Sequence, residues 1–480
     1  GVSEGTPDAG IDITVTNLAI ESDAGVDIDA NVTTLAINNA DAAANVRVGS
    51  TSASLTIGSV TTSAGTLAGI TAAGSVTVAG AAAITVDNAV TANGGGINLT
   101  TSTGDLTINA NVTAPTAGAG SVVLNAGDDV LLNTGTVQSI GTGDFRIDAG
   151  TSTGTGVFTM AAGTLLGSSG GSLTIDADGN VTIAEIDHQS VGATDDVTII
   201  STNGSITLLT GEGGLVATDG ASVVLNADTG VTLNDVLTVD NAATITIDAD
   251  IDNNGAGSLT TSAAGTITAA TGSIQIIAAD VSLAGTLASS GNLTLQPSTT
   301  GSGIGVGGGT GAFNVSDAEI LLLTDGFTSI TIGDSTGGTG AVDIDSSTFV
   351  DTITIVGGSI AVTGLTGNDA ADNGDGTGLQ AVTLTARTGN ITDGENAGAT
   401  DVTGSLITLN AEAGAIGEAT GSGNGSLELA ATTLVTDSTN GANNGAQFLT
   451  EADSLTWNSS SAGSGTITIT AGTFNIASGE

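Results

Sequence analysis

Residues 173–183 read LTIDADGNVTI, and residues 197–208 read VTIISTNGSITL. Each stretch contains two triplets of an apolar residue, a Thr and an apolar residue, separated by a short turn that holds Gly and Asn. Because side chains alternate between the two faces of a strand, each triplet predicts a short strand with apolar side chains on one face and Thr on the other. Gly and Asn tolerate the left-handed backbone conformation that a sharp corner requires.

The same triplet recurs along the whole chain. Further copies lie at residues 55–57, 76–78, 84–86, 106–108, 231–233, 245–247, 293–295, 330–332, 353–355, 382–384 and 467–469. Where neighbouring motifs are visible, their starts lie 25 residues apart (99 to 124), 24 (175 to 199), 26 (199 to 225) and 25 (384 to 409). A nearly constant step with variable corners indicates a solenoid, in which each strand pairs with its equivalent in the next coil.

We therefore predict an all-β fold, a right-handed parallel β-helix (solenoid) of about 19 coils that forms a rod. Strands this short cannot bury their apolar faces alone, whereas stacked coils join Val, Ile and Leu into internal columns. Aromatic residues make up only 2% of the chain, which disfavours aromatic-anchored sandwiches. We expect regular coils over residues 1–295. Over residues 296–480 we expect the same β-helix with longer Gly/Asn/Asp-rich loops at 296–312, 364–379, 418–426 and 436–447.

The composition excludes several classes of partner. The formal charge is −46, from 49 acidic residues against three basic ones. Nucleic-acid binding draws its affinity from Lys and Arg, so we expect no nucleic acid as a partner. No apolar run approaches the roughly 18 residues that span a bilayer, so we expect no direct membrane insertion. The simplest interpretation of the acidic residues is a solvated, self-repelling coat that keeps a large protein soluble.

Four repeat units carry a likeness to a known family. They are LTARTGNI (384–391), LNAEAGAI (409–416), SLTIDADGNVTI (172–183) and GNLTL (291–295). These units resemble the repeats of filamentous-haemagglutinin-like exoproteins and related autotransporter passengers, and the resemblance covers most of the chain. It implies a right-handed parallel β-helix, secretion across an outer membrane, and roles in adhesion, aggregation or surface coating.

Acidic clusters are the candidate metal sites, with calcium as the one cofactor that the sequence suggests. Calcium takes six to eight oxygen ligands, which Asp, Asn and backbone carbonyls in flexible loops supply. The candidate ligands are Asp248, Asp250 and Asp252 on one strand, and Asp369, Asp372 and Asp375 in a Gly-rich loop. The Asp27–Asp29 and Asp343–Asp345 pairs also place two carboxylates on one side of a strand.

Catalytic machinery is sparse, and we predict no catalytic residue and no enzyme. His188 is the single His, and we expect it at a solvated corner between strands. A β-helix polysaccharide lyase or hydrolase is the alternative function, because close carboxylate pairs can serve as acid and base. Ice binding is a minor alternative, because three Thr pairs have the Thr-x-Thr spacing of ice-binding β-helices: Thr244 with Thr246, Thr352 with Thr354, and Thr466 with Thr468.

We expect a structural or adhesive protein, outside the cell or on a bacterial cell surface. A β-helical rod of this kind acts as an adhesin stalk or as a self-assembling fibre or sheath subunit. The expected partners are further copies of the chain, joined end to end, or other surface proteins and glycans. Residues 1–4 show no signal peptide, so we expect that an export signal has been removed or that the chain starts inside a larger precursor.

Overall fold

The fold is built almost entirely from β-strands, which confirms the predicted all-β class. The computed structural model describes residues 2–3, 10–40, 44–115, 120–192, 195–369, 378–395, 398–419, 425–440 and 443–476. The chain divides into two compact units. Unit 1 is Gly1–Ile251 with Thr261–Thr268, and unit 2 is Asp252–Thr260 with Ala269–Glu480. Among the described residues the one helix is α1 (Asp317–Ile320).

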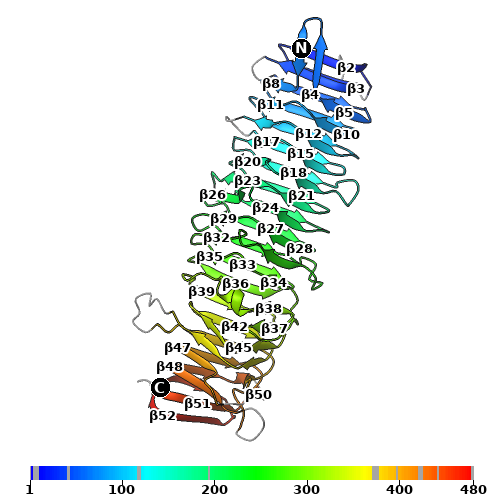
Figure 1. Cartoon of the computed structure of the whole chain (residues 1–480). Helices are drawn as coiled ribbons and strands as arrows, with labels where there is room; N and C mark the ends of the chain where they lie inside the picture. The colour runs from blue at the N-terminus through cyan, green and yellow to red at the C-terminus, as the bar shows by residue number, and fades with distance from the viewer. Residues whose placement is uncertain are drawn as a thin grey trace. The chain divides into compact units, whose positions relative to one another are not determined.

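Unit 1 contains three rows of parallel strands, and successive strands along the chain visit the rows in turn (Figure 1). The first row is β4 (Val46–Ser50), β9 (Val76–Gly80), β12 (Ile97–Thr101), β15 (Val122–Ala126), β18 (Phe145–Ala149), β21 (Leu173–Ala177), β24 (Val197–Ser201), β27 (Val223–Ala227) and β30 (Ile245–Asp248). The second row is β5 (Ser54–Ile57), β10 (Ala83–Val86), β13 (Leu106–Ile108), β16 (Val130–Leu132), β19 (Phe158–Met160), β22 (Val181–Ile183), β25 (Ile206–Leu208) and β28 (Gly230–Leu233). The third row is β8 (Ile70–Ala72), β11 (Val90–Ala92), β14 (Val112–Ala114), β17 (Thr136–Ser139), β20 (Leu165–Ser169), β23 (Glu185–Gln189), β26 (Gly214–Thr218) and β29 (Leu237–Val239).

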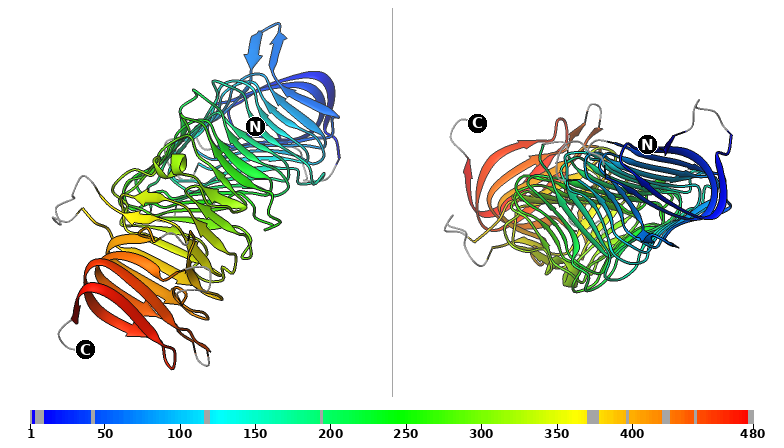
Figure 2. Two further views of the ribbon diagram at one scale, coloured as in Figure 1. Left: turned by 60° about the horizontal axis from the view of Figure 1, so that its bottom comes forward. Right: turned by 90° about the horizontal axis from the view of Figure 1, so that it is seen from above.

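The first strands of unit 1 are less regular. Strand β3 (Val26–Asn39) is long enough to pair with β4, β5 and β8, and so it belongs to all three rows. It also pairs in parallel with β2 (Ile13–Ser22) and β1 (Val2–Ser3). Strands β6 (Ser59–Thr62) and β7 (Gly65–Ala68) form an antiparallel hairpin, which projects from the stacked strands in Figure 2.

The pairing register confirms the repeat spacing seen in the sequence. Within the first row Leu99 lies opposite Leu124, Ile175 opposite Ile199, and Ile199 opposite Leu225. These are the motif starts that lie 24–26 residues apart. Each strand therefore pairs with the strand three places further along the chain. This connectivity is consistent with a β-solenoid of three strands per coil.

Aliphatic side chains form the interior of unit 1. In the first row the inward residues Ile147, Ile175, Ile199 and Leu225 each have none of their surface exposed, and they stack in consecutive coils. Fully burying an Ile or Leu side chain contributes about 1.5–3 kcal/mol. The predicted internal columns of Val, Ile and Leu are therefore present, and their burial stabilises the stacking of the coils.

Asn and Asp residues join successive coils at the corners. Each lies directly before a strand, and its side-chain Oδ1 accepts a hydrogen bond from the backbone amide at the equivalent position one coil later. The pairs are Asn45–Ser75 (2.9 Å), Asn111–Thr136 (3.0 Å), Asp129–Val157 (2.9 Å), Asp144–Ser172 (3.1 Å), Asn180–Ser205 (3.0 Å), Asp196–Ser222 (2.9 Å) and, in unit 2, Asn390–Ala415 (2.8 Å). Part of the acidic composition therefore serves the fold itself, by satisfying amides that the strand ladders leave unpaired.

Glycine is required where two coils approach closely at a corner. Gly171, before β21, has φ +76°, and a Cβ there would lie 2.6 Å from the carbonyl of Gly143 in the preceding coil. Both the backbone conformation and the contact exclude larger residues.

Unit 2 contains corresponding parallel rows with longer connections. Its first row is β33 (Ile274–Ala278), β36 (Asn292–Pro297), β39 (Ser329–Ile332), β42 (Ile353–Gly357), β45 (Val382–Ala386), β47 (Val402–Ala411), β48 (Leu427–Asp437), β51 (Gln447–Ser461) and β52 (Ile467–Ile476). A five-stranded parallel sheet has the order β38 (Phe313–Val315), β37 (Ile304–Val306), β40 (Val342–Ile344), β43 (Ile360–Val362) and β46 (Ile391–Asp393). Strands β31 (Ser258–Thr261) and β32 (Ile267–Ala269) contain residues of both units. The remaining strands of unit 2 are β34 (Val281–Ser282), β35 (Leu287–Ala288), β41 (Ser347–Phe349), β44 (Leu365–Gly367), β49 (Thr439–Asn440) and β50 (Asn443–Asn444).

In unit 2 the predicted pairing of two motifs is present, whereas one predicted loop contains a strand. The motif starts Leu384 and Leu409 lie opposite each other in β45 and β47, as their spacing predicts. The stretch 296–312, expected as a loop, contains β37, because Ile304 and Val306 alternate with Gly305 and enter the core.

Candidate functional site

Three carboxylates converge in unit 2 where β46, β47 and β48 follow one another. Asp393 is the last residue of β46, Asp401 directly precedes β47, and Glu428 is the second residue of β48. One oxygen from each carboxylate lies within 4.8 Å of the others. Asp393 and Asp401 are buried and Glu428 is half-buried. This group, called the carboxylate triad below, is the one such group of three potential ligands in the part of the chain that the structure describes.

Backbone hydrogen bonds hold the triad in place. The Asp401 amide donates to the Glu428 carbonyl (2.8 Å), and the Glu428 amide donates back to Asp401 Oδ2 (2.7 Å). Asp393 Oδ1 accepts from the Glu395 amide (2.8 Å), and the Ser426 hydroxyl donates to Glu428 Oε1 (3.1 Å). Asp401 Oδ1 and Glu428 Oε2 are buried and have no hydrogen-bond partner among the described residues.

The surroundings of Asp401 disfavour its ionised form. Burial raises its pKa, the hydrogen bond from the Glu428 amide opposes this, and the charge of Asp393 together with the Glu428 carboxyl raises the pKa further, to about 8. An uncompensated Asp401 therefore holds a proton at neutral pH.

The expectation that Asp248, Asp250 and Asp252 share one strand is wrong, because β30 ends at Asp248 and the chain turns at residues 251–252. Asp248 and Asp250 belong to unit 1, and Asp252 belongs to unit 2. The Asp250 amide donates to Asp248 Oδ1 (3.2 Å), and burial together with the charge of Asp250 raises the pKa of Asp248. Asp252 is exposed and accepts from the amide (3.1 Å) and the side chain (2.8 Å) of Asn254. Asp252 thus stabilises a local turn.

The second predicted cluster is described only in part. Asp369 is buried, and its amide donates to the carbonyl of Gly378 (2.6 Å). Its charge, with that of Asp325, adds to the burial that raises the pKa of Asp351. Asp372 and Asp375 lie outside the described residues.

The expectation of a solvated corner for His188 is wrong. His188 lies within β23 and has none of its surface exposed. Alternation along β23 directs Ile186 and His188 inward while Asp187 faces out, so the position follows from strand parity. His188 Nε2 donates to the Asp195 carbonyl (2.8 Å), and burial lowers the His188 pKa. A buried, neutral imidazole with a backbone partner is a core residue here.

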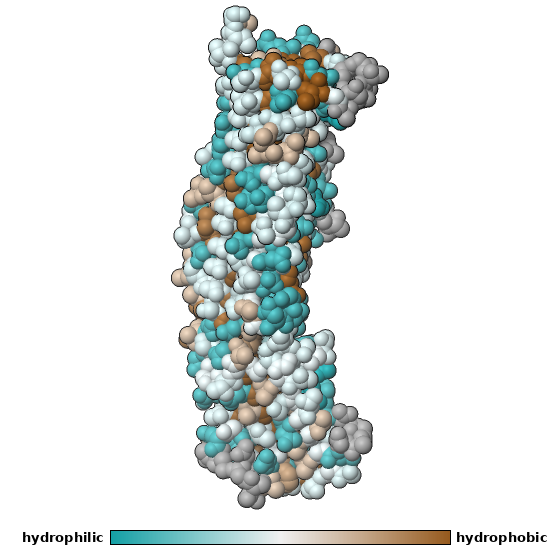
Figure 3. All heavy atoms as spheres, turned by 90° about the vertical axis from the view of Figure 1, so that its right-hand side faces the viewer, coloured by the Kyte–Doolittle hydropathy of each residue, from teal (hydrophilic) through white to brown (hydrophobic). Residues whose placement is uncertain are grey.

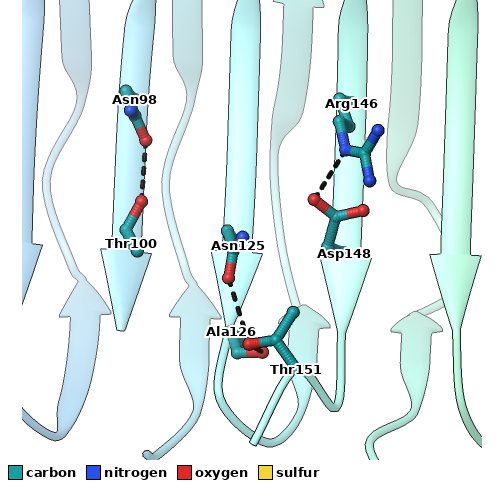
Figure 4. A network of polar contacts seen from close by, with 7 residues as sticks. All are labelled: Asn98, Thr100, Asn125, Ala126, Arg146, Asp148 and Thr151. Atoms are coloured by element: carbon teal, nitrogen blue, oxygen red, sulfur yellow. Dashed lines mark hydrogen bonds and ion pairs between the residues drawn. The ribbon is translucent and has the colours of Figure 1, made fainter. Parts of the chain in front are cut away.

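Short polar side chains form columns on the outer faces of unit 1. On the first row Asn98 accepts from Thr100 (2.8 Å), Thr151 donates to Asn125 (3.3 Å), and Arg146 pairs with Asp148 (2.7 Å; Figure 4). The second row carries an outward column of Thr that is interrupted by one Leu. Its members, in order, are Thr56, Thr85, Thr107, Leu131, Thr159, Thr182, Thr207 and Thr232.

Hydrophilic and near-neutral residues predominate on the face shown in Figure 3, where hydrophobic ones are mostly scattered. The exceptions gather at one end of the face shown. Among the first strands of unit 1 and the residues next to them, Val2, Ile11 and Val15 are exposed. In unit 2 a groove of about 560 Å³ is lined by Asp317, Leu321, Thr348, Glu395 and Thr400, among others. Glu395 and Thr400 belong to the segment that joins Asp393 to Asp401, so the groove reaches the connection between two members of the triad.

Comparisons with known proteins found no match. No family model, no curated protein and no solved structure is similar to this chain at a significant level. Among the described residues no helix is both long and apolar enough to cross a membrane.

Proposed function

We propose that this protein is a structural and adhesive component of the bacterial cell surface or the extracellular medium. In this proposal the chain is a right-handed parallel β-helix of about 19 coils, acting as an adhesin stalk or as a subunit of a fibre or sheath. One observation carries the proposal: within unit 1, coil after coil pairs in register around an aliphatic core, while the outer faces display short polar side chains. Each further coil of a β-helix lengthens the protein and extends the same hydrophobic core, and such a fold is suited to a spacer or a scaffold.

The side chains on the outer faces support this function. The half-buried Thr columns and the Asn, Asp and Arg contacts of the first row offer many hydrogen-bonding groups to a glycan or to a protein surface. The charge of −46 opposes collapse of neighbouring molecules onto each other. The expected partners are further copies of the chain, or other surface proteins and glycans.

The proposal is tested by displaying the chain on cells that do not adhere and by imaging the purified protein. We expect binding to glycan- or protein-coated surfaces, or filaments at high protein concentration in electron micrographs. A protein that stays monomeric, binds no coated surface and cleaves acidic or neutral polysaccharides would overturn the proposal in favour of a polysaccharide lyase or hydrolase.

Ice binding is a second candidate, favoured by the Thr column of the second row. Neighbouring strands in a sheet lie about 4.8 Å apart, so the column presents hydroxyl and methyl groups at a regular interval. Thermal hysteresis of the intact chain that is lost in a Thr182→Lys/Thr207→Lys variant would support this function. Freezing behaviour equal to that of an inert protein of the same charge would exclude it.

A further inference from the structure

The carboxylate triad concentrates acidic side chains in a chain that has few basic ones. Asp393, Asp401 and Glu428 bring together up to three negative charges, and the chain has only three basic residues. Each of these contacts another group: Arg47 pairs with Asp27, Arg146 pairs with Asp148, and Arg387 donates to the carbonyls of Ser335 and Thr336. The charge of the triad must therefore be balanced by protons or by a bound cation.

The orientation of two oxygens distinguishes the triad from an ordinary acidic surface. Asp401 has none of its surface exposed, and its Oδ1 has no hydrogen-bond partner in the described part of the chain, nor has the buried Glu428 Oε2. The other oxygen of each carboxylate is already engaged, Asp401 Oδ2 by the Glu428 amide and Glu428 Oε1 by Ser426. Buried carboxylate oxygens without donors are costly unless they coordinate a ligand.

We propose that Asp393, Asp401 and Glu428 bind one Ca²⁺ ion. Calcium–oxygen distances of about 2.3–2.6 Å place ligands on opposite sides of one ion about 5 Å apart. The oxygens of the triad lie within 4.8 Å of one another, so all three can contact the same ion. Carbonyl oxygens and water complete the six to eight ligands that calcium takes. Magnesium requires shorter bonds and retains several waters, which suits this buried position less well.

The site goes beyond the structural role proposed above, because it makes the stability of one part of unit 2 depend on an ion. Its ligands come from β46, from the residue before β47, and from β48. An ion held there ties together three chain segments, which are otherwise joined by the hydrogen bonds between Asp401 and Glu428 and by the Gly425 amide that donates to Asp393 Oδ2 (3.4 Å).

A shared proton is the competing explanation. A protonated Asp401 donating to Glu428 would satisfy both unpartnered oxygens without an ion, and the raised pKa of Asp401 agrees with this state when no cation is present. The two explanations differ in what happens at neutral pH when calcium is added. Calcium must displace the proton, whereas a purely protonated site ignores calcium.

The test is calorimetric titration of the full chain with CaCl₂ in about 0.15 M salt, which screens weak surface binding. The variant is D401N/E428Q, and the matched control is E412Q/E418Q, which removes two charges from half-buried residues of the same unit. We expect one saturable site per chain in wild type and control, and binding at least about tenfold weaker in D401N/E428Q. Saturable binding that persists in D401N/E428Q, or is lost in E412Q/E418Q, would overturn the proposal.

A second measurement uses the wild-type chain alone and so does not depend on how the variant folds. Urea denaturation is compared in CaCl₂ and in chelator, because a ligand that binds only the folded chain stabilises it. We expect a higher unfolding midpoint in calcium than in chelator. The absence of saturable binding together with an unchanged midpoint would contradict the assignment and favour the shared proton.

Discussion

Removing one complete coil should shorten the protein without unfolding it. Deleting residues 173–196 excises β21, β22 and β23 and joins Ser172 to Val197. In the first row β18 then meets β24, because Phe145 and Val197 are both partners of Leu173. In the second row Phe158 meets Ile206 in the same way. Every inward column therefore stays in register across the junction.

The magnitude follows from what the deletion removes. Folded proteins gain roughly 0.05–0.15 kcal/mol per residue, so loss of one coil should cost about 1–4 kcal/mol. The deletion also removes the hydrogen bond from the Ser222 amide to Asp196, worth about 1 kcal/mol. We expect a single cooperative unfolding transition in urea at a moderately lower midpoint, with an unchanged β-type circular dichroism spectrum.

Deletion of residues 185–196 is the matched comparison, because it also removes β23 but leaves β21 and β22. Strand β22 of the second row would then be followed directly by β24 of the first row, with no strand of the third row between them. Leu166 in the third row would lose Ile186 as its partner. This shorter deletion should unfold or aggregate the chain. If the two deletions are equally harmful, or if the shorter one is better tolerated, the assignment of a three-strand coil is refuted.

Three further predictions follow from the strand rows, the corners and the buried His. Ile175→Ala should lower the free energy of unfolding by about 2–5 kcal/mol through loss of a stacked core side chain, whereas Thr174→Ala on the outer face should cost about 1 kcal/mol or less, both measured by urea denaturation. Asp196→Ala should cost about 1–2 kcal/mol because it leaves the Ser222 amide unpaired, whereas Asp187→Ala, which removes an equal charge from an exposed position, should change stability by about 0.5 kcal/mol or less; equal effects would refute the corner role. Burial lowers the His188 pKa, so the folded chain favours the neutral ring. This preference stabilises the folded chain fully above about pH 6.5, the ordinary pKa of His. The stabilisation decreases as the pH falls below that value and through the lower pKa of the folded state. His188→Gln, which retains an N–H donor, should lose that part of the pH dependence between pH 7.5 and 5, and an unchanged slope would contradict the assignment.

The strands and their pairing could be predicted from the sequence because two local signals agree. Alternation identifies the inward residues, and the step of 24–26 residues identifies their partners, as Ile175, Ile199 and Leu225 illustrate. His188 was misplaced because a polar residue was expected outside. His188 lies two residues after Ile186 in β23, so both side chains are on the same face of the strand, and this spacing predicts a buried His188.

The functional features were harder to predict because they depend on contacts between coils. A corner Asp such as Asp196 looks like any surface acid until the register shows which amide lies beside it. The carboxylate triad combines residues 8 and 27 positions apart, and the lengths of the connections, not a local motif, bring them together. The one available signal was that Asp401 and Glu428 lie about one coil step apart.

The central claim is that each strand pairs in parallel with its equivalent in the next coil, and engineered disulfides test it most directly. The chain has no Cys, so a Thr174→Cys/Thr198→Cys variant introduces one possible bridge. These residues lie opposite each other in β21 and β24, and a disulfide requires Cα atoms about 4.4–6.8 Å apart. We predict rapid, nearly complete intramolecular disulfide formation in the dilute folded protein. A Thr174→Cys/Thr207→Cys control places its second thiol on the second row, opposite Thr182, and should remain reduced. Bridging in the control, or its absence in the first variant, would contradict the fold on which the functional proposals depend.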